Sequence, residues 1–130
     1  MSRIAAALLA LATLVVLIAG CGDDVQLHPD VVAVDITAEE AHVFRFDVTV
    51  SSPYDSPDRY ADAWRVVGPD ATVLGTRELA HDHAGEQPFT RSLSGVEIAA
   101  DVATVTVEAR DLANGWGGAT IEVDVPHRKG

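Results

Sequence analysis

Residues 42–51 read HVFRFDVTVS, and apolar and polar side chains alternate along them. One face of this stretch carries His42, Phe44, Phe46, Val48 and Val50, and the other carries Val43, Arg45, Asp47, Thr49 and Ser51. Successive side chains of a β-strand point to opposite faces of the sheet. The alternation therefore predicts an antiparallel strand with one buried face and one solvated face.

Six further stretches share this period of two, and no window of helical length has a helical period. The predicted strands are residues 31–37, 42–51, 60–67, 71–79, 89–93, 103–111 and 119–125. Short strands with frequent turns predict an all-β fold, an immunoglobulin-like or fibronectin III-like β-sandwich of about seven antiparallel strands. A small β-barrel is the alternative. Trp64 suits the core of such a sandwich, and the lack of a cysteine pair favours the fibronectin-like variant.

The N-terminus has the pattern of an export signal. Arg3 precedes sixteen uncharged residues, 4–19, and small residues come just before the only cysteine, Cys21. Ile18-Ala19-Gly20-Cys21 resembles the bacterial lipobox. The resemblance implies cleavage after Gly20, a diacylglyceryl thioether on Cys21 and acylation of its new amino group.

Four segments follow from this pattern. They are a signal peptide (1–20), a lipidated tether (21–30), a β-sandwich domain (31–126) and a basic tail (127–130). The lipid on Cys21 would hold the domain in the cell envelope. With Gly22 after the cysteine, we expect the outer membrane, facing the periplasm, in a two-membraned cell. Otherwise we expect the outer face of the cytoplasmic membrane.

The charge balance bounds the partners. The chain has a formal net charge of −11 at pH 7, and loss of Arg3 makes the mature chain more negative. Such a surface repels phosphate backbones, so nucleic acid is not an expected partner. We expect a monomer that is bound to the membrane through its lipid and meets an envelope protein or a glycan.

Strand parity predicts where such a partner binds. If successive strands alternate in direction, the loops 52–59, 81–88 and 113–118 share one end of the sandwich. The candidate partner-binding residues in these loops are Tyr54, Asp55, Asp58 and Trp116. Trp116 has a second interpretation, in which its flanking glycines let it fold inward as a lid on the core.

Two loops also suggest metal ligands. His81 and His83 point the same way in an extended segment, and Glu86 follows as a third ligand or an outer partner. Imidazole with carboxylate suits zinc or copper, so a small metal-binding lipoprotein is the alternative function. Carboxylates at Asp55, Asp58 and Asp62 suit calcium, although their spacing matches no EF-hand. The primary expectation is a protein without a cofactor.

No pattern predicts catalysis. The serines lie in no Gly-x-Ser-x-Gly elbow, no cysteine remains once Cys21 is lipidated, and Gly115-Trp116-Gly117-Gly118 joins two predicted strands rather than a strand and a helix. The expected function is a non-catalytic binding or accessory module.

Residues 60–118 carry one further resemblance. Their motifs are His81-Asp82-His83, residues 86–93 (EQPFTRSL), Arg110-Asp111 and Gly115-Trp116-Gly117-Gly118. They resemble a group of small, uncharacterised exported proteins and lipoproteins of alphaproteobacterial type. The resemblance covers about half of the chain, supports an envelope location and implies no activity.

Overall fold

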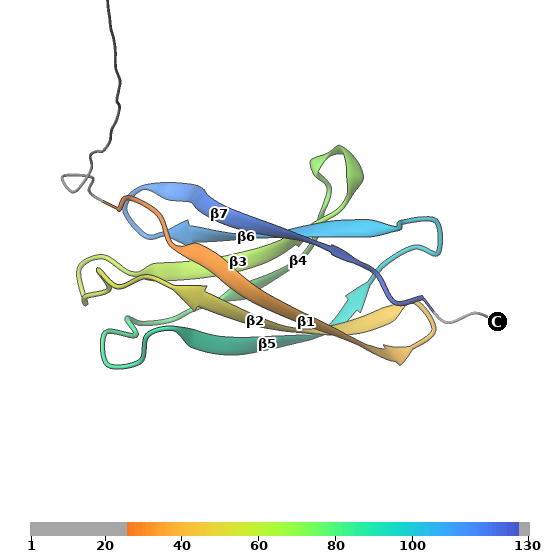
Figure 1. Ribbon diagram of the computed structural model, residues 1–130, viewed down its shortest axis with the longest axis horizontal. Helices are drawn as coiled ribbons and strands as arrows, with labels where there is room; N and C mark the ends of the chain where they lie inside the picture. Colours follow the sequence, from red (N-terminus) through yellow and green to blue (C-terminus); the bar gives the residue numbers. More distant parts are fainter. Residues whose placement is uncertain (1–25, 128–130) are drawn as a thin grey trace, which may run out of the picture.

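The computed structural model describes residues 26–127, which form two antiparallel sheets packed face to face (Figure 1). The order is β1-β2-β5 in one sheet and β4-β3-β6-β7 in the other. The strands are β1 (Asp30–Glu40), β2 (Val43–Ser51), β3 (Ala61–Val67), β4 (Val73–Glu78), β5 (Phe89–Glu97), β6 (Thr104–Asp111) and β7 (Gly115–Asp124). The predicted all-β class and the sandwich are confirmed. The predicted signal peptide and Cys21 lie outside the described residues.

The core lies between the sheets and is closed by aromatic side chains. Trp64, Phe44, Phe46 and Phe89 are all at most 1% exposed. Trp64 on β3 packs from the four-stranded sheet, and the three phenylalanines pack from β2 and β5. The described residues include no cysteine, so non-covalent contacts, above all apolar packing, stabilise this part of the chain.

Strict alternation along 31–37 places Val32 on one face with Val34 and Ile36, and along 60–67 it places Asp62 on the face of Trp64. Irregular strand pairing changes both placements. A register shift between Val31 and Ala33 buries Val31 and leaves Val32 48% exposed. A second shift, between Ala61 and Ala63, buries Ala61 and turns Asp62 away from the face of Trp64. A β-bulge inserts one unpaired residue, and everything beyond it changes face.

Three strands are longer than predicted, and the first of them, β1, runs from Asp30 to Glu40 instead of 31–37. β5 continues past Leu93 to Glu97, because a bulge opposite Phe44 and Phe46 returns Val96 to the core. β7 begins at Gly115, four residues before the predicted start, so residues 115–117 pair with β6 and do not form a loop. The β6–β7 connection is consequently a tight hairpin of residues 112–114.

The last part of the predicted tether packs on the domain. Residues 26–29, which we call the strap, cross the start of β7, and Pro29 is buried. A Cβ atom on Gly117 would lie 2.5 Å from the His28 ring, and one on Gly118 would lie 2.0 Å from the Pro29 carbonyl oxygen. The glycines of β7 therefore make room for the strap. Residues 26–30 belong to the folded domain, which corrects the predicted boundary at residue 31.

We predict that Gly118→Ala destabilises the domain more than Gly115→Ala. Both glycines have a positive φ, +78° and +80°, so alanine meets similar backbone strain at either position. Only at Gly118 does the new methyl group also collide with Pro29, whereas nothing lies within 4 Å at Gly115. We expect an additional loss of about 1–3 kcal/mol from this overlap. Urea unfolding followed by tryptophan fluorescence measures it, and equal losses would contradict the packing of the strap.

Candidate functional site

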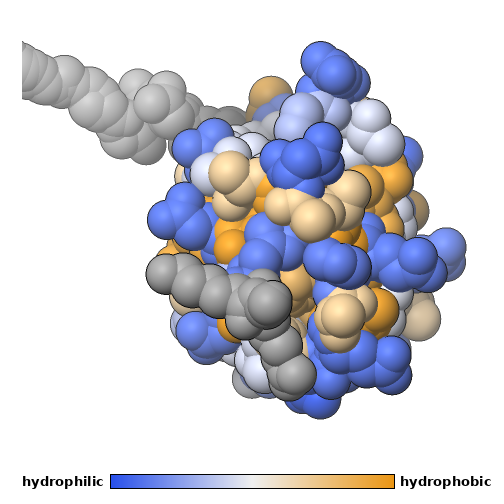
Figure 2. Space-filling view, turned by 90° about the vertical axis from the view of Figure 1, so that its right-hand side faces the viewer, coloured by the Kyte–Doolittle hydropathy of each residue, from blue (hydrophilic) through white to orange (hydrophobic). Residues whose placement is uncertain are grey.

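Three connections meet at one end of the sandwich, which we call the loop end (left in Figure 1). They are the β2–β3 loop (52–60), the β4–β5 loop (79–88) and the β6–β7 hairpin (112–114). The strap enters at the same end. The predicted clustering is confirmed. The opposite end mixes hydrophobic and hydrophilic residues (Figure 2).

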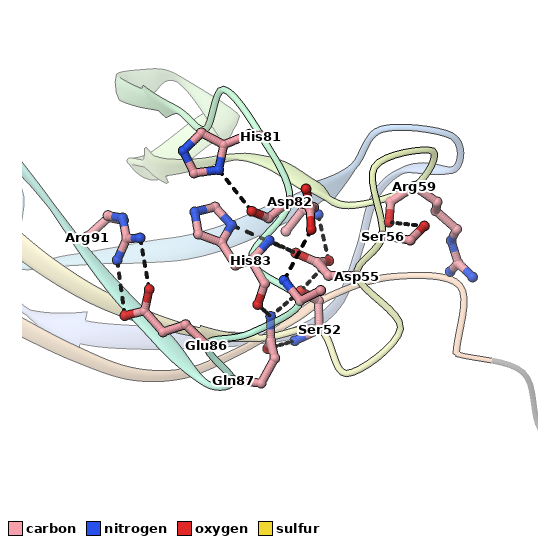
Figure 3. Close-up of polar contacts among 12 residues, drawn as sticks. Ser52, Asp55, Ser56, Arg59, His81, Asp82, His83, Glu86, Gln87 and Arg91 are labelled. Carbon is pink, nitrogen blue, oxygen red and sulfur yellow. Dashed lines mark hydrogen bonds and ion pairs between the residues drawn. The ribbon is translucent and has the colours of Figure 1, made fainter.

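Asp55 joins two of these loops through a buried carboxylate (Figure 3). Its Oδ1 accepts hydrogen bonds from the Ser52 hydroxyl at 2.6 Å and from the Ala61 backbone N–H at 3.1 Å. Its Oδ2 accepts the His83 backbone N–H at 3.0 Å. Asp55 was predicted to bind a partner, and the structure places its side chain fully buried between the loops that it holds together.

Gln87 adds a second brace between the same loops (Figure 3). Its Oε1 accepts the Ser52 backbone N–H at 2.7 Å, and its Nε2 donates to the His83 carbonyl oxygen at 3.1 Å. Buried polar groups are costly unless they are paired. These paired contacts therefore specify one relative position of the two loops.

The imidazole ring of His83 is buried against the core. The ring stacks on Phe89 with centroids 3.9 Å apart, and its side chain is only 4% exposed. Its Nδ1 lies 3.8 Å from Asp55 Oδ2 and makes no hydrogen bond. Burial, aided by the nearby Arg91 and His81, lowers the pKa of His83 below its usual value. The ring is therefore neutral near pH 7.

The predicted metal ligands have other partners. The Glu86 carboxylate pairs with the Arg91 guanidinium at 3.0 Å, and this hydrogen bond lowers the pKa of Glu86. His81 and His83 are neighbours, with ring centroids 5.1 Å apart, but His81 Nδ1 lies 2.9 Å from the Asp82 carbonyl oxygen. Between residues 26 and 127, no three histidine, cysteine or acidic side chains are grouped for a metal ion.

The acidic residues predicted for calcium have separate environments. Asp55 is buried in the brace, Asp58 is exposed, and Asp62 pairs with Arg110 Nη1 at 2.5 Å on the outside of the four-stranded sheet. The Asp62 pairing follows from the bulge in β3, which turned this side chain outward.

A second cluster joins the β2–β3 loop to the β6–β7 hairpin. The Arg59 guanidinium lies 3.8 Å from the centre of the Tyr54 ring, and Arg59 Nε donates to Asp111 Oδ1 at 3.3 Å. Asp111 Oδ2 accepts the backbone N–H groups of Ala113 and Asn114 at 3.0 and 2.9 Å. Burial opposes ionisation of Asp111, but the hydrogen bonds from Asn114 and its neighbours lower its pKa.

This cluster changes the interpretation of Tyr54. Burial raises the pKa of its phenol, and Arg59 covers its ring. Tyr54 is therefore part of the loop packing rather than a free aromatic anchor. Of the four predicted partner-binding residues, Asp58 is the exposed one.

Trp116 lies within β7, which corrects its predicted placement in a loop. It pairs in register with Arg110. Its ring packs against the Arg65 guanidinium at 3.8 Å, and Arg65 in turn contacts Glu108 Oε1 at 2.5 Å. Arg65 and Glu108 are directly opposite each other on β3 and β6. The side chain thus lies among charged residues and does not cover the core.

Sequence reasoning missed Ser52, Gln87, Arg59 and Asp111, which carry most of the polar contacts at this end. Only Asp111 had a local signal, since an aspartate three residues before an Asn-Gly pair is typical of a capped turn. The other three act through contacts between loops distant in sequence.

Comparison with known proteins gives no match to a family model, to a curated protein or to a solved structure. Across residues 26–127, no helix has the length and apolar character needed to cross a membrane.

We predict that Asp55→Asn destabilises the domain by about 1–3 kcal/mol, the cost of leaving one buried donor unpaired. The amide presents one oxygen and one N–H₂ group to a site where both oxygens accept hydrogen bonds from N–H or O–H donors. Asp58→Asn is the matched control in the same loop, and its exposed side chain predicts a change within about 0.5 kcal/mol. Urea unfolding midpoints give both values, and similar losses in both variants would contradict the brace.

We predict that His83 makes stability fall on mild acidification. Its native pKa lies below the ordinary value of 6.5, so the unfolded chain binds this proton more readily than the folded chain. Stability is then complete above pH 6.5 and decreases as the pH falls toward the lower, native pKa. His83→Phe keeps the stacking and removes the proton. Between about pH 7 and 5, the free energy of unfolding of the wild type should therefore decrease relative to that of the variant. A difference independent of pH would refute this.

Proposed function

We propose that this chain is an envelope lipoprotein whose β-sandwich is a non-catalytic binding or accessory module. The observation that carries the proposal is the loop end, where the buried carboxylates of Asp55 and Asp111 accept hydrogen bonds that hold three connections in one arrangement. Loops on a rigid scaffold are common positions for recognition. Rigid loops also lower the entropy cost of binding.

The proposal includes a fibronectin III-like sandwich. In the immunoglobulin constant arrangement, the strand after C joins the sheet of A, B and E, which makes four strands opposite three. Here β4 instead pairs with β3, so three strands, β1, β2 and β5, face four. The absence of a cysteine pair supports the same variant.

The side chains at the loop end support binding over catalysis. Asp55 and Asp111 are buried and already accept hydrogen bonds from backbone N–H groups, and Glu86 is paired with Arg91. A general acid, base or nucleophile needs a free lone pair or proton within reach of a substrate. An envelope protein, a glycan or a lipid surface would meet the outer atoms of these loops.

The lipid anchor rests on the sequence before the described residues. An uncharged segment after Arg3 ends in Ile18-Ala19-Gly20-Cys21, and this pattern supports export, cleavage after Gly20 and lipidation of Cys21. Stable anchoring takes two lipid signals, which a diacylglyceryl group with an added acyl chain supplies. The proposed location is the outer membrane, facing the periplasm, or the outer face of a single membrane.

We predict that Cys21→Ala abolishes incorporation of labelled fatty acid when the chain is expressed in a bacterial host with lipoprotein-processing enzymes. Mass spectrometry of the N-terminal peptide should show an acylated Cys21 in the wild type and an unprocessed signal in the variant. Ser51→Ala is a control for expression and leaves labelling unchanged. A wild-type chain cleaved elsewhere, or cleaved at Gly20 without lipid, would refute the proposal.

A further inference from the structure

The strap is fastened to the loop end by contacts on both of its sides. Arg59, which already binds Asp111, donates a hydrogen bond to the Gln26 carbonyl oxygen. His28 Nδ1 lies 3.2 Å from the Gly115 carbonyl oxygen, at the start of β7. Asp30 then accepts the Ala119 N–H at 2.8 Å. The chain is thus held against the domain from residue 26 onward.

This fastening limits how far the loop end can lie from a lipid on Cys21. Cys21 is five positions before Gln26. A fully extended chain spans at most about 3.3–3.6 Å per residue, so the free segment reaches about 17 Å. The domain is about as long as its strands, and β1 has 11 residues, so it spans roughly 35 Å. The reach of the free segment is therefore about half the length of the domain, which disfavours turning it end over end.

Exposed apolar side chains are concentrated at the same end. Four large hydrophobic residues are strongly exposed within residues 26–127, namely Leu27, Val32, Val73 and Leu112. Leu27 is in the strap, Leu112 is at the tip of the β6–β7 hairpin, and Val32 is next to the Val31–Val50 pair that closes the loop end. Val73 is the first residue of β4, directly after the β3–β4 turn, and lies at the end opposite the loop end.

We propose that the loop end is docked on the bilayer that holds the Cys21 lipids, with Leu27 and Leu112 in contact with the lipid surface; this rests on the lipidation proposed above. The partner of the loop end is then the membrane itself. The net charge of −11 repels anionic headgroups, so electrostatics opposes this contact. Contact is therefore apolar, the lipids on Cys21 supply the affinity, and the short fastened entry sets the orientation.

The test uses the full lipidated chain in vesicles of phosphatidylcholine and phosphatidylglycerol. An environment-sensitive dye is attached either at Leu112→Cys or at Val73→Cys, since the lipidated Cys21 leaves no other thiol. The two positions are matched in exposure, at 41% and 46%, and lie at opposite ends. Nitroxide-labelled lipid quenches a dye that touches the bilayer, and iodide quenches one that faces water.

We expect nitroxide lipid to quench the dye at position 112 several-fold more than the dye at position 73, with the reverse order for iodide. Inserting ten Gly/Ser residues between Cys21 and Gln26 should reduce the difference, because the domain can then turn. Equal quenching at both positions, or stronger lipid quenching at 73, overturns the inference. Protection of position 112 from both quenchers also overturns it and indicates a second copy of the chain as the occupant.

Failure of the anchor and failure of the orientation give different results. A chain without lipid on Cys21 does not float with the vesicles, and its N-terminal peptide has no acyl mass, which refutes the proposed function and the docking together. A chain that floats with the vesicles but has an unquenched dye at position 112 refutes only the docking.

Discussion

The buried carboxylate of Asp55 is the interaction on which the loop end depends. It accepts hydrogen bonds from Ser52, Ala61 and His83. One side chain therefore joins the start of the β2–β3 loop, the first residue of β3 and the β4–β5 loop. A charge in this place is expensive to desolvate, and it is tolerated because three donors surround it. An apolar side chain would fill the space but would leave the N–H groups of Ala61 and His83 without acceptors. The loops therefore have one geometry that is fixed by donors and acceptors rather than by volume.

The same principle operates at the second acidic residue, with a different result. Asp111 satisfies the hairpin donors of Ala113 and Asn114 on one oxygen and pairs with Arg59 on the other. Arg59 continues to the strap through Gln26. A residue in β6 is thus linked through one guanidinium to the segment that enters the domain. The position of the N-terminal entry is consequently part of the loop packing as well as of its contacts with β7.

The alternation in residues 42–51 was sufficient to predict an all-β sandwich, because one face of β2 is buried and the other is partly or fully exposed along its length. Loop clustering also followed from the sequence, since it needs only the parity of strand direction.

The errors occurred at bulges and glycines. Strict alternation placed Val32 and Asp62 on the wrong face, because it cannot reveal the unpaired residues of a bulge. Trp116 was placed in a loop because three nearby glycines are typical of turns, whereas two of them clear space for His28 and Pro29. The contacts of Ser52 with Gln87 join positions 35 residues apart, and a single sequence has no signal for them.

The glycines of β7 also show why the strap and the strand are interdependent. A strand with side chains at positions 117 and 118 would exclude His28 and Pro29 from its surface. Glycine inside a strand costs conformational entropy and gives no side chain to pack. Contacts with the entry segment offset that cost here. Pro29 is buried where the side chains would have been, and Asp30 accepts the Ala119 N–H beside it. The domain thus gives up side-chain packing on its edge strand to hold its own entry segment in a fixed place. A flexible tether would need no such space. The glycines therefore indicate that a fixed position of residues 26–29 is part of this fold.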